Sequence, residues 1–163
     1  MAVVCNATPI INFAVINRLD ILQAIFRQIV IPQAVYDETT GLGFPGSRVV
    51  LQATTSGWLQ VCSVSTAKNT VPLELDDGER EAIALALETG EQRILLDERE
   101  ARQVAQSFGL QVIGTLGILI LAKNQRIIPQ VQPLLDTMIE TAQYWVSDAL
   151  YRQVLQQAGE VVE

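Results

Sequence analysis

The chain has 163 residues, of which 49% are hydrophobic and 18% are charged, and its formal net charge is −7. A chain of this length fits one domain with a substantial core, and its apolar composition favours elements buried on both faces, as in a parallel sheet covered by helices. Histidine is absent, which excludes a histidine-based zinc site, a histidine general base and a Ser-His-Asp triad. Chemistry in this chain would therefore rest on carboxylates, lysine, hydroxyl groups or a metal ion.

Short β-branched segments alternate with helical patterns in the first part of the chain. In chain order, the sequence predicts a strand at Val3–Cys5, a helix beginning at Thr8 and Pro9, a helix at Leu19–Phe26, a strand at Ile29–Ile31, a helix opened by Pro32, a loop at Gly41–Gly46, a helix at Arg48–Thr55 and a strand at Leu59–Val64. Threonine is a favoured N-cap and proline is favoured at the first helical position, which sets the predicted start of the first helix.

The same alternation continues in the rest of the chain. A linker at Lys68–Pro72 is followed by a helix at Asp76–Glu88, a strand at Arg93–Leu96, a helix at Glu98–Phe108, a strand at Gln111–Ile113 and helices at Leu116–Lys123, Gln130–Ala142 and Asp148–Ala158. Such alternation favours a parallel sheet with right-handed crossovers. We therefore predict a three-layer α/β/α fold with a central parallel sheet, in a single domain over residues 1–163. Its core spans about residues 2–125, and extra C-terminal helices span about residues 130–158.

The cysteines and the apolar segments indicate a cellular setting. Cys5 and Cys62 lie in apolar strand-like segments, which favours two buried reduced thiols over a disulfide or a metal pair. No positive charge precedes Arg18, so a signal peptide is not expected. The apolar run at Leu116–Ala122 is too short to cross a bilayer. These features predict a cytoplasmic protein without membrane contact.

Polar side chains directly follow two of the predicted strands. Asn6 follows the first strand, and Asp97 and Glu98 follow the strand that ends at Leu96. Ligands of open α/β sheets bind beyond the carboxyl ends of the strands, so these positions are the best-placed candidates for a site. Glu38 and Glu79 lie in the helices that follow other predicted strands or linkers.

Each of these polar residues also has a purely structural interpretation. The segments Asp76–Glu79 and Asp97–Glu100 both match a capping box, with an acid at the N-cap and Glu three residues later. Asn6 fits a helix cap or a turn, and Glu38 fits a solvated helix position. Capping and metal binding are compatible, so the residues alone leave both interpretations open.

Several segments together resemble the PIN-domain superfamily, most closely its branch of VapC-like proteins. They are VVCNATPIIN at residues 3–12, LDIL at 19–22 leading into IVIPQAVYDE at 29–38, LDDGEREAIALA at 75–86 followed by ILLDEREAR at 94–102, and GTLG at 114–117. The resemblance extends over about residues 2–125. It implies a metal-dependent ribonuclease, often a toxin that an antitoxin protein holds in check.

The resemblance also implies a set of site residues. It places the four acidic positions of the family on Asn6, Glu38, Glu79 and Asp97. Glu98 is the neighbouring candidate for the last position, and which of Asp97 and Glu98 is the main metal ligand stays open. Oxygen ligands of this kind fit Mg²⁺ or Mn²⁺. The family normally has Asp at the first position. Because Asn6 offers a carbonyl oxygen without a charge, we expect weaker metal binding and reduced or absent nuclease activity.

The helix after Asp97 carries candidate phosphate ligands. Arg99 and Arg102 are placed to contact the phosphates of RNA, and ordinary solvated helix charges are the alternative. The resemblance implies an antitoxin protein as a partner. The apolar composition leaves apolar surface that an amphipathic partner peptide or a homodimer would cover.

Two other functions stay open. A catalytically silent PIN-fold module that binds RNA or a protein partner is favoured by Asn6 and by the net charge of −7, because nucleic-acid-binding domains are usually basic. Acids gathered at a metal site would account for part of that charge, and bound cations would offset it locally. An unrelated α/β protein, such as a phosphoacceptor receiver or a phosphatase, is the third. A receiver needs an aspartate pair after the first strand, and no Asp precedes Asp20.

Overall fold

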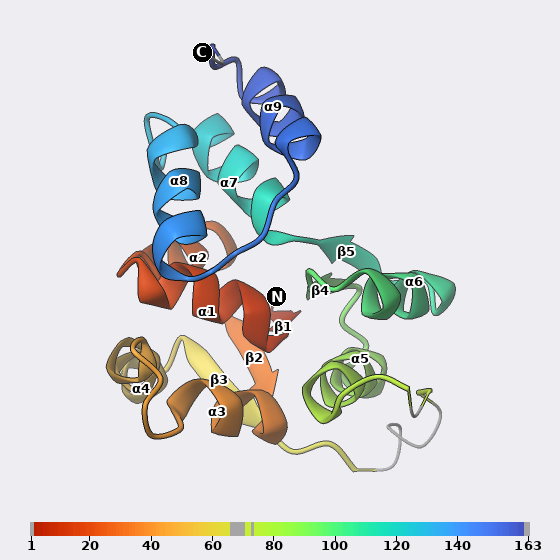
Figure 1. The fold of residues 1–163 in the computed structure, drawn as a ribbon. Coiled ribbons are helices and arrows are strands. Elements are labelled where there is room, and N and C mark those ends of the chain that lie inside the picture. Colours follow the sequence, from red (N-terminus) through yellow and green to blue (C-terminus); the bar gives the residue numbers. More distant parts are fainter. Residues whose placement is uncertain (1, 66–70, 73, 162–163) are drawn as a thin grey trace.

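The computed structural model describes residues 2–65, 71–72 and 74–161. Its strands are β1 (Val3–Cys5), β2 (Ile29–Pro32), β3 (Leu59–Cys62), β4 (Arg93–Leu95) and β5 (Gln111–Ile113). They form a parallel five-stranded sheet in the order β3-β2-β1-β4-β5 (Figure 1). The predicted α/β fold with a central parallel sheet between helices is confirmed. The predicted linker at Lys68–Pro72 lies mostly outside the described residues.

Helices cover both faces of this sheet. They are α1 (Ala7–Val15), α2 (Asp20–Phe26), α3 (Gln33–Thr40), α4 (Ser47–Ser56), α5 (Asp77–Thr89), α6 (Arg99–Ser107), α7 (Thr115–Asn124), α8 (Gln132–Thr141) and α9 (Asp148–Gln157). Successive side chains of a strand point to opposite faces. Val3 and Cys5 therefore pack in the core shared with α1, α2, α7 and α8, while Val4 packs against α5 and α6 (Figure 1).

The strand order places a topological switch point between β1 and β4. The chain builds outward from β1 through β2 to β3, and then returns to the other side of β1 for β4 and β5. The backbone amide of Asn6 donates to the carbonyl of Leu95 at 2.9 Å, which joins the carboxyl ends of the two strands. Open α/β sheets bind ligands at such a point. Asn6 and Asp97 therefore lie where the topology favours a site.

The start of the first helix differs from the prediction. Helix α1 begins at Ala7, so Asn6 is the N-cap and Pro9 is the third helical residue. Proline is tolerated there because the first N–H groups of a helix have no partner within the helix. The Thr8 hydroxyl does not cap α1; it donates to the Glu98 carboxylate instead. Thr8 and Pro9 mark the right helix, but the N-cap assignment to Thr8 was wrong.

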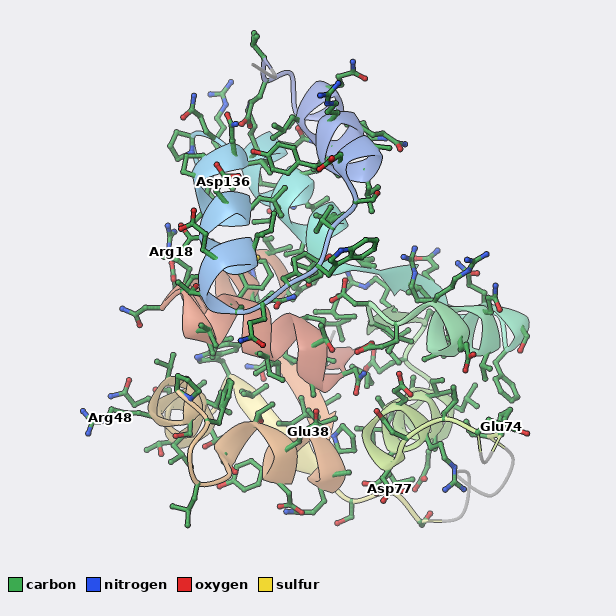
Figure 2. All side chains as sticks on the ribbon, in the orientation of Figure 1. Arg18, Glu38, Arg48, Glu74, Asp77 and Asp136 are labelled. Atoms are coloured by element: carbon green, nitrogen blue, oxygen red, sulfur yellow. The ribbon has the colours of Figure 1, made fainter. Side chains whose placement is uncertain are left out.

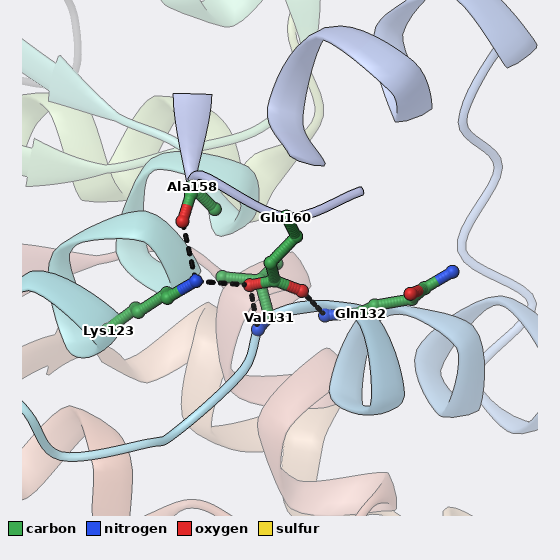
Figure 3. Close-up of polar contacts among 5 residues, drawn as sticks. All are labelled: Lys123, Val131, Gln132, Ala158 and Glu160. Carbon is green, nitrogen blue, oxygen red and sulfur yellow. Dashed lines mark hydrogen bonds and ion pairs between the residues drawn. The ribbon is translucent and has the colours of Figure 1, made fainter. Parts of the chain in front are cut away.

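The last turns of the chain are fastened to the core by one buried carboxylate (Figure 3). Glu160 accepts hydrogen bonds from the backbone amides of Val131 at 2.7 Å and Gln132 at 3.0 Å, and from Lys123 Nζ at 3.0 Å. Lys123 also donates to the carbonyl of Ala158. These bonds tie the segment after α9 to the end of α7 and the start of α8.

Two further features bear on the predictions from sequence. Cys5 is buried as predicted, whereas Cys62 is only half-buried, and both cysteines are free. Within residues 2–65, 71–72 and 74–161, no helix combines the length and the apolar character needed to cross a bilayer.

Candidate functional site

Asn6 lies buried at the end of β1 with its amide only half satisfied. The residue is 3% exposed. Its Nδ2 donates to Glu98 Oε2 at 3.4 Å, while its Oδ1 has no hydrogen-bond partner among the described residues. The other oxygen of Glu98 accepts from Thr8. If the Asn6 amide were turned over, its oxygen would face the Glu98 carboxylate, which has no proton to donate. The amide oxygen therefore lacks a donor in either orientation.

The unpartnered oxygen of Asn6 faces other oxygens around Gly78. A methyl group placed on Gly78 would lie 3.3 Å from Glu38 Oε1, 3.4 Å from Asn6 Oδ1 and 3.6 Å from Asp76 Oδ1. Glu38 comes from α3, which packs beside α5, and Figure 2 shows Glu38 and Asp77 on these neighbouring helices. Three chain segments therefore bring oxygens to one point. The absence of a side chain at Gly78 leaves that point open.

Asp76 was missed as a site residue by the sequence reasoning, which considered it only as a cap. The capping box is confirmed: the amide of Glu79 donates to Asp76 Oδ1 at 2.7 Å, and the amide of Asp76 donates to Glu79 Oε1 at 3.1 Å. This cap fixes the Asp76 carboxylate at the start of α5, next to Gly78. The Asp76-Asp77-Gly78-Glu79 run was the available signal, since it puts an acid and a glycine at a helix start. Glu79 itself is directed into the cap.

Asp97 is held by the next helix along the sheet. Its Oδ1 accepts from the amide of Thr115 at 2.9 Å, and its Oδ2 accepts from the Thr115 hydroxyl at 2.6 Å. Tyr144 donates from its hydroxyl to Asp97 Oδ1 at 3.4 Å, and Asn12 donates to Thr115 Oγ1 at 3.1 Å. The predicted capping box over Asp97–Glu100 is wrong. Helix α6 begins at Arg99, and its N-cap is Glu98, which makes no side-chain cap bond. Asp97 does not cap the helix because Thr115 binds both oxygens of its carboxylate.

The predicted site residues thus form two neighbouring groups. Asn6 and Glu38 meet Asp76 at Gly78, while Asp97 is held by Thr115 and Tyr144, and Glu98 bridges Asn6 and Thr8. In the described part of the chain, no three His, Cys, Asp or Glu side chains are placed to hold one ion together. Asn6 is not one of these residue types. Its carbonyl oxygen and the Glu38 and Asp76 carboxylates are nevertheless the ligands that hard divalent cations prefer, so the group at Gly78 fits such a cation.

Burial and crowding of negative charge favour the protonated forms of three acids. Burial, followed by the charges of Asp76 and Glu98, raises the pKa of Glu38. Burial also raises the pKa of Glu79, against the cap bond from Asp76. Burial raises the pKa of Asp97 as well, although the Thr115 hydrogen bonds act in the opposite direction. Such shifts arise where carboxylates lack a counter-charge.

A stability measurement checks this electrostatic picture. Because the folded protein binds protons at Glu38, Glu79 and Asp97 more tightly than the unfolded chain does, its free energy of unfolding should rise as the pH is lowered from about 7 to about 5 in the presence of a chelator. The window is free of histidine titration. Burial alone would raise the pKa of Glu160, but the hydrogen bonds that Glu160 accepts outweigh burial and lower this pKa. The stability that ionised Glu160 contributes is therefore lost only at more acidic pH. Urea unfolding at a series of pH values tests this, and a fall in stability over the same range would contradict it.

The predicted phosphate ligands lie on the outer face of α6. Arg99 and Arg102 are exposed and line a shallow depression of about 170 Å³ with Gln103 and Gln106. Burial, followed by the charge and hydrogen bond of Asp97, raises the pKa of Tyr144, and the charge of Arg102 acts in the opposite direction. Arg99 and Arg102 belong to the first turns of α6, the helix that begins directly after Asp97 and Glu98.

A parallel sheet with an acidic switch point, enclosed by helices, defines an α/β protein with a carboxylate site. The sequence model of the PIN-domain family matches residues 2–160, so the chain belongs to the PIN-domain family. The match continues through the C-terminal helices, beyond residue 125, where the resemblance seen in the sequence ended. PIN domains are commonly nucleases and generally use divalent metal ions. No curated protein and no solved structure matches the chain.

Proposed function

We propose that this PIN domain is a metal-dependent endoribonuclease that hydrolyses RNA phosphodiester bonds with Mg²⁺ or Mn²⁺. The observation that carries the proposal is the buried Oδ1 of Asn6, which has no hydrogen-bond partner among residues 2–65, 71–72 and 74–161 and lies near the same point as oxygens of Glu38 and Asp76. A buried oxygen without a donor is unfavourable unless something positive compensates it. A divalent cation is the ligand that satisfies several such oxygens at once.

Each residue of the proposed site has a distinct role. The proposed ligands, directly or through water, are Asn6, Glu38, Asp76, Glu79, Asp97 and Glu98. A bound divalent ion lowers the pKa of water and stabilises charge on the leaving oxygen. Thr115 keeps both oxygens of Asp97 in one orientation, which limits the reorganisation that ligation requires. Arg99 and Arg102 hold the phosphates of the RNA strand on either side of the scissile bond.

Asn6 is proposed to lower the activity of this site. Its amide gives one neutral oxygen where the resemblance to PIN domains implies a carboxylate, and its Nδ2 already pairs with Glu98. Both effects weaken the attraction for a divalent ion. A fully silent module that binds RNA or a protein partner is the second candidate, and it is favoured by the same Asn6 and by the lack of a three-acid group within the described residues.

The biological setting follows from the same proposal. A VapC-like toxin would have an antitoxin protein as its partner, act on RNA in the cytoplasm and form a homodimer. The hydrophobic share of 49% supports a partner that covers apolar surface. These assignments remain predictions, as does the single domain over residues 1–163.

RNA cleavage and Mn²⁺ titration on the same protein test the proposed function. The wild-type chain should bind Mn²⁺ and cut RNA, and a chelator should stop the cleavage. Asp97→Asn should lower cleavage because it removes a charge while keeping the shape of the side chain. Glu140→Gln, an exposed acid on α8, is the matched control and should change nothing. Wild-type protein that binds RNA but neither binds Mn²⁺ nor cuts would support the silent module.

A further inference from the structure

The chain contains two tryptophans in opposite environments. Trp58 is 9% exposed and packs in the core, whereas Trp145 is 82% exposed. Trp145 lies in the connector between α8 and α9, which Figure 1 shows as the blue segment joining these helices. An indole in solvent offers a large flat apolar surface to a ligand.

The connector presents Trp145 in a fixed position. Its neighbours Tyr144 and Val146 both pack against the hydrophobic core. The amide of Tyr144 donates to the carbonyl of Met138 at 3.3 Å, and the Ser147 side chain caps α9. With Tyr144 and Val146 packed against the core, the side chain between them is left facing solvent. Burying the indole would require release of Tyr144 or Val146, so the exposure is built into the fold.

This exposed indole lies beside the acidic site. The preceding residue, Tyr144, donates its hydroxyl to Asp97 Oδ1 at 3.4 Å. Arg99 and Arg102 lie in the first turns of α6, which begins directly after Asp97 and Glu98, and both line a depression on that helix. The exposed indole, the two guanidinium groups and the carboxylate of Asp97 are therefore carried by segments that adjoin one another near the carboxyl end of β4. Bases, phosphates and the scissile bond of a nucleic acid strand are the groups that match these three features.

We propose that Trp145 stacks on a base of single-stranded RNA while Arg99 and Arg102 hold the adjoining phosphates. The inference rests on the proposed function and adds a residue that would position the substrate, Trp145. Bases within a duplex are stacked on one another, so only an unpaired base is free to stack on the indole. Every base has a flat face, so this contact selects for single strands and not for a particular sequence.

Binding of a short RNA strand in the presence of a chelator tests the proposal without cleavage. Trp145→Ala should weaken binding of the single strand roughly tenfold, because base stacking on an aromatic ring is lost. Trp145→Phe should retain most of the affinity but lose the change in tryptophan fluorescence on RNA binding, since Trp58 is buried. Phe108→Ala removes an exposed aromatic side chain at the far end of α6 and should leave the affinity unchanged. The same strand annealed to its complement should bind weakly to every variant.

The outcomes separate this inference from the proposed nuclease function. Equal RNA affinity of wild type and Trp145→Ala, or no RNA binding at all, would overturn the stacking role of Trp145. Dissociation of a homodimer by Trp145→Ala in sedimentation would also overturn it, because it would place Trp145 in a protein interface. Binding that depends on Trp145 without cleavage under Mn²⁺ would support the stacking role and count against the nuclease. RNA cleavage with an RNA affinity that Trp145→Ala does not change would support the nuclease and count against the stacking role.

Discussion

Replacement of Asn6 by Asp is expected to tighten Mn²⁺ binding by roughly ten- to a hundredfold and to raise RNA cleavage with it. The substitution adds a negative charge at a side chain that is buried and already faces the oxygens of Glu38 and Asp76. In a partly desolvated site a charged ligand attracts a divalent ion far more strongly than a neutral amide does. Calorimetric titration with Mn²⁺ and RNA cleavage on both proteins measure the change.

The same substitution should destabilise the metal-free protein. Asp at position 6 loses the hydrogen bond that Asn6 Nδ2 donates to Glu98, and it sets two carboxylates against each other. A buried charge without a partner lowers the free energy of unfolding by about 1–3 kcal/mol. Saturating Mn²⁺ should more than recover this loss, because an ion that binds only the folded state stabilises it by mass action. Urea unfolding with chelator and with Mn²⁺ gives both values.

Asn12→Asp is the matched control for this experiment. Asn12 is also buried, on the neighbouring helix α1, but its Nδ2 donates to Thr115 and not to an acid. It should destabilise the protein, and Mn²⁺ should recover no more of this loss than the stability it adds to the wild-type protein, because position 12 supplies no ligand to the ion. Equal Mn²⁺ affinity of wild type and Asn6→Asp would mean that position 6 is not a ligand. Metal binding by Asn6→Asp alone would identify the natural chain as a silent module.

Gly78→Ala is expected to abolish Mn²⁺ binding and RNA cleavage while leaving the fold as stable as before or more so. The added methyl group would lie 3.3 Å from Glu38 Oε1 and 3.4 Å from Asn6 Oδ1, in the space that an ion needs beside these oxygens. Gly78 lies in the first turn of α5. Alanine favours a helix over glycine by up to about 1 kcal/mol. The nearby atoms are the ends of side chains, and Glu38 is exposed enough to move aside.

Gly117→Ala separates the effect on the site from the effect on the helix. Gly117 lies in α7, and a methyl group there would make only an ordinary contact of 3.5 Å with Ile113. It should raise stability by a similar amount and leave cleavage intact. Unfolding curves and cleavage assays are needed for both variants. Full activity in Gly78→Ala would show that the oxygens around Gly78 do not bind the ion, and a large loss of stability would show that the space there is structural.

Local patterns in the sequence were enough to define the fold. The strands and helices appear close to the predicted ranges because their signals are local: β-branched runs form strands, and glycines such as Gly57 and Gly90 end helices with φ of 91° and 76°. The capping box at Asp76 and Glu79 was also predicted correctly, since all its atoms belong to four consecutive residues. The second predicted box failed at Asp97, where a partner distant in the sequence, Thr115, competed for the carboxylate.

The sequence by itself therefore determined the α/β class, the PIN-domain resemblance and the edge of the sheet where the polar residues gather. Only the tertiary structure decided how these polar residues form two groups. Asn6, Glu38 and Asp76 lie around Gly78, and Asp97 is held by Thr115 and Tyr144. Helix and strand signals act over a few neighbouring residues. The partner of a buried carboxylate depends on how helices pack across the sheet, and that packing joins residues as far apart as Asp97 and Tyr144.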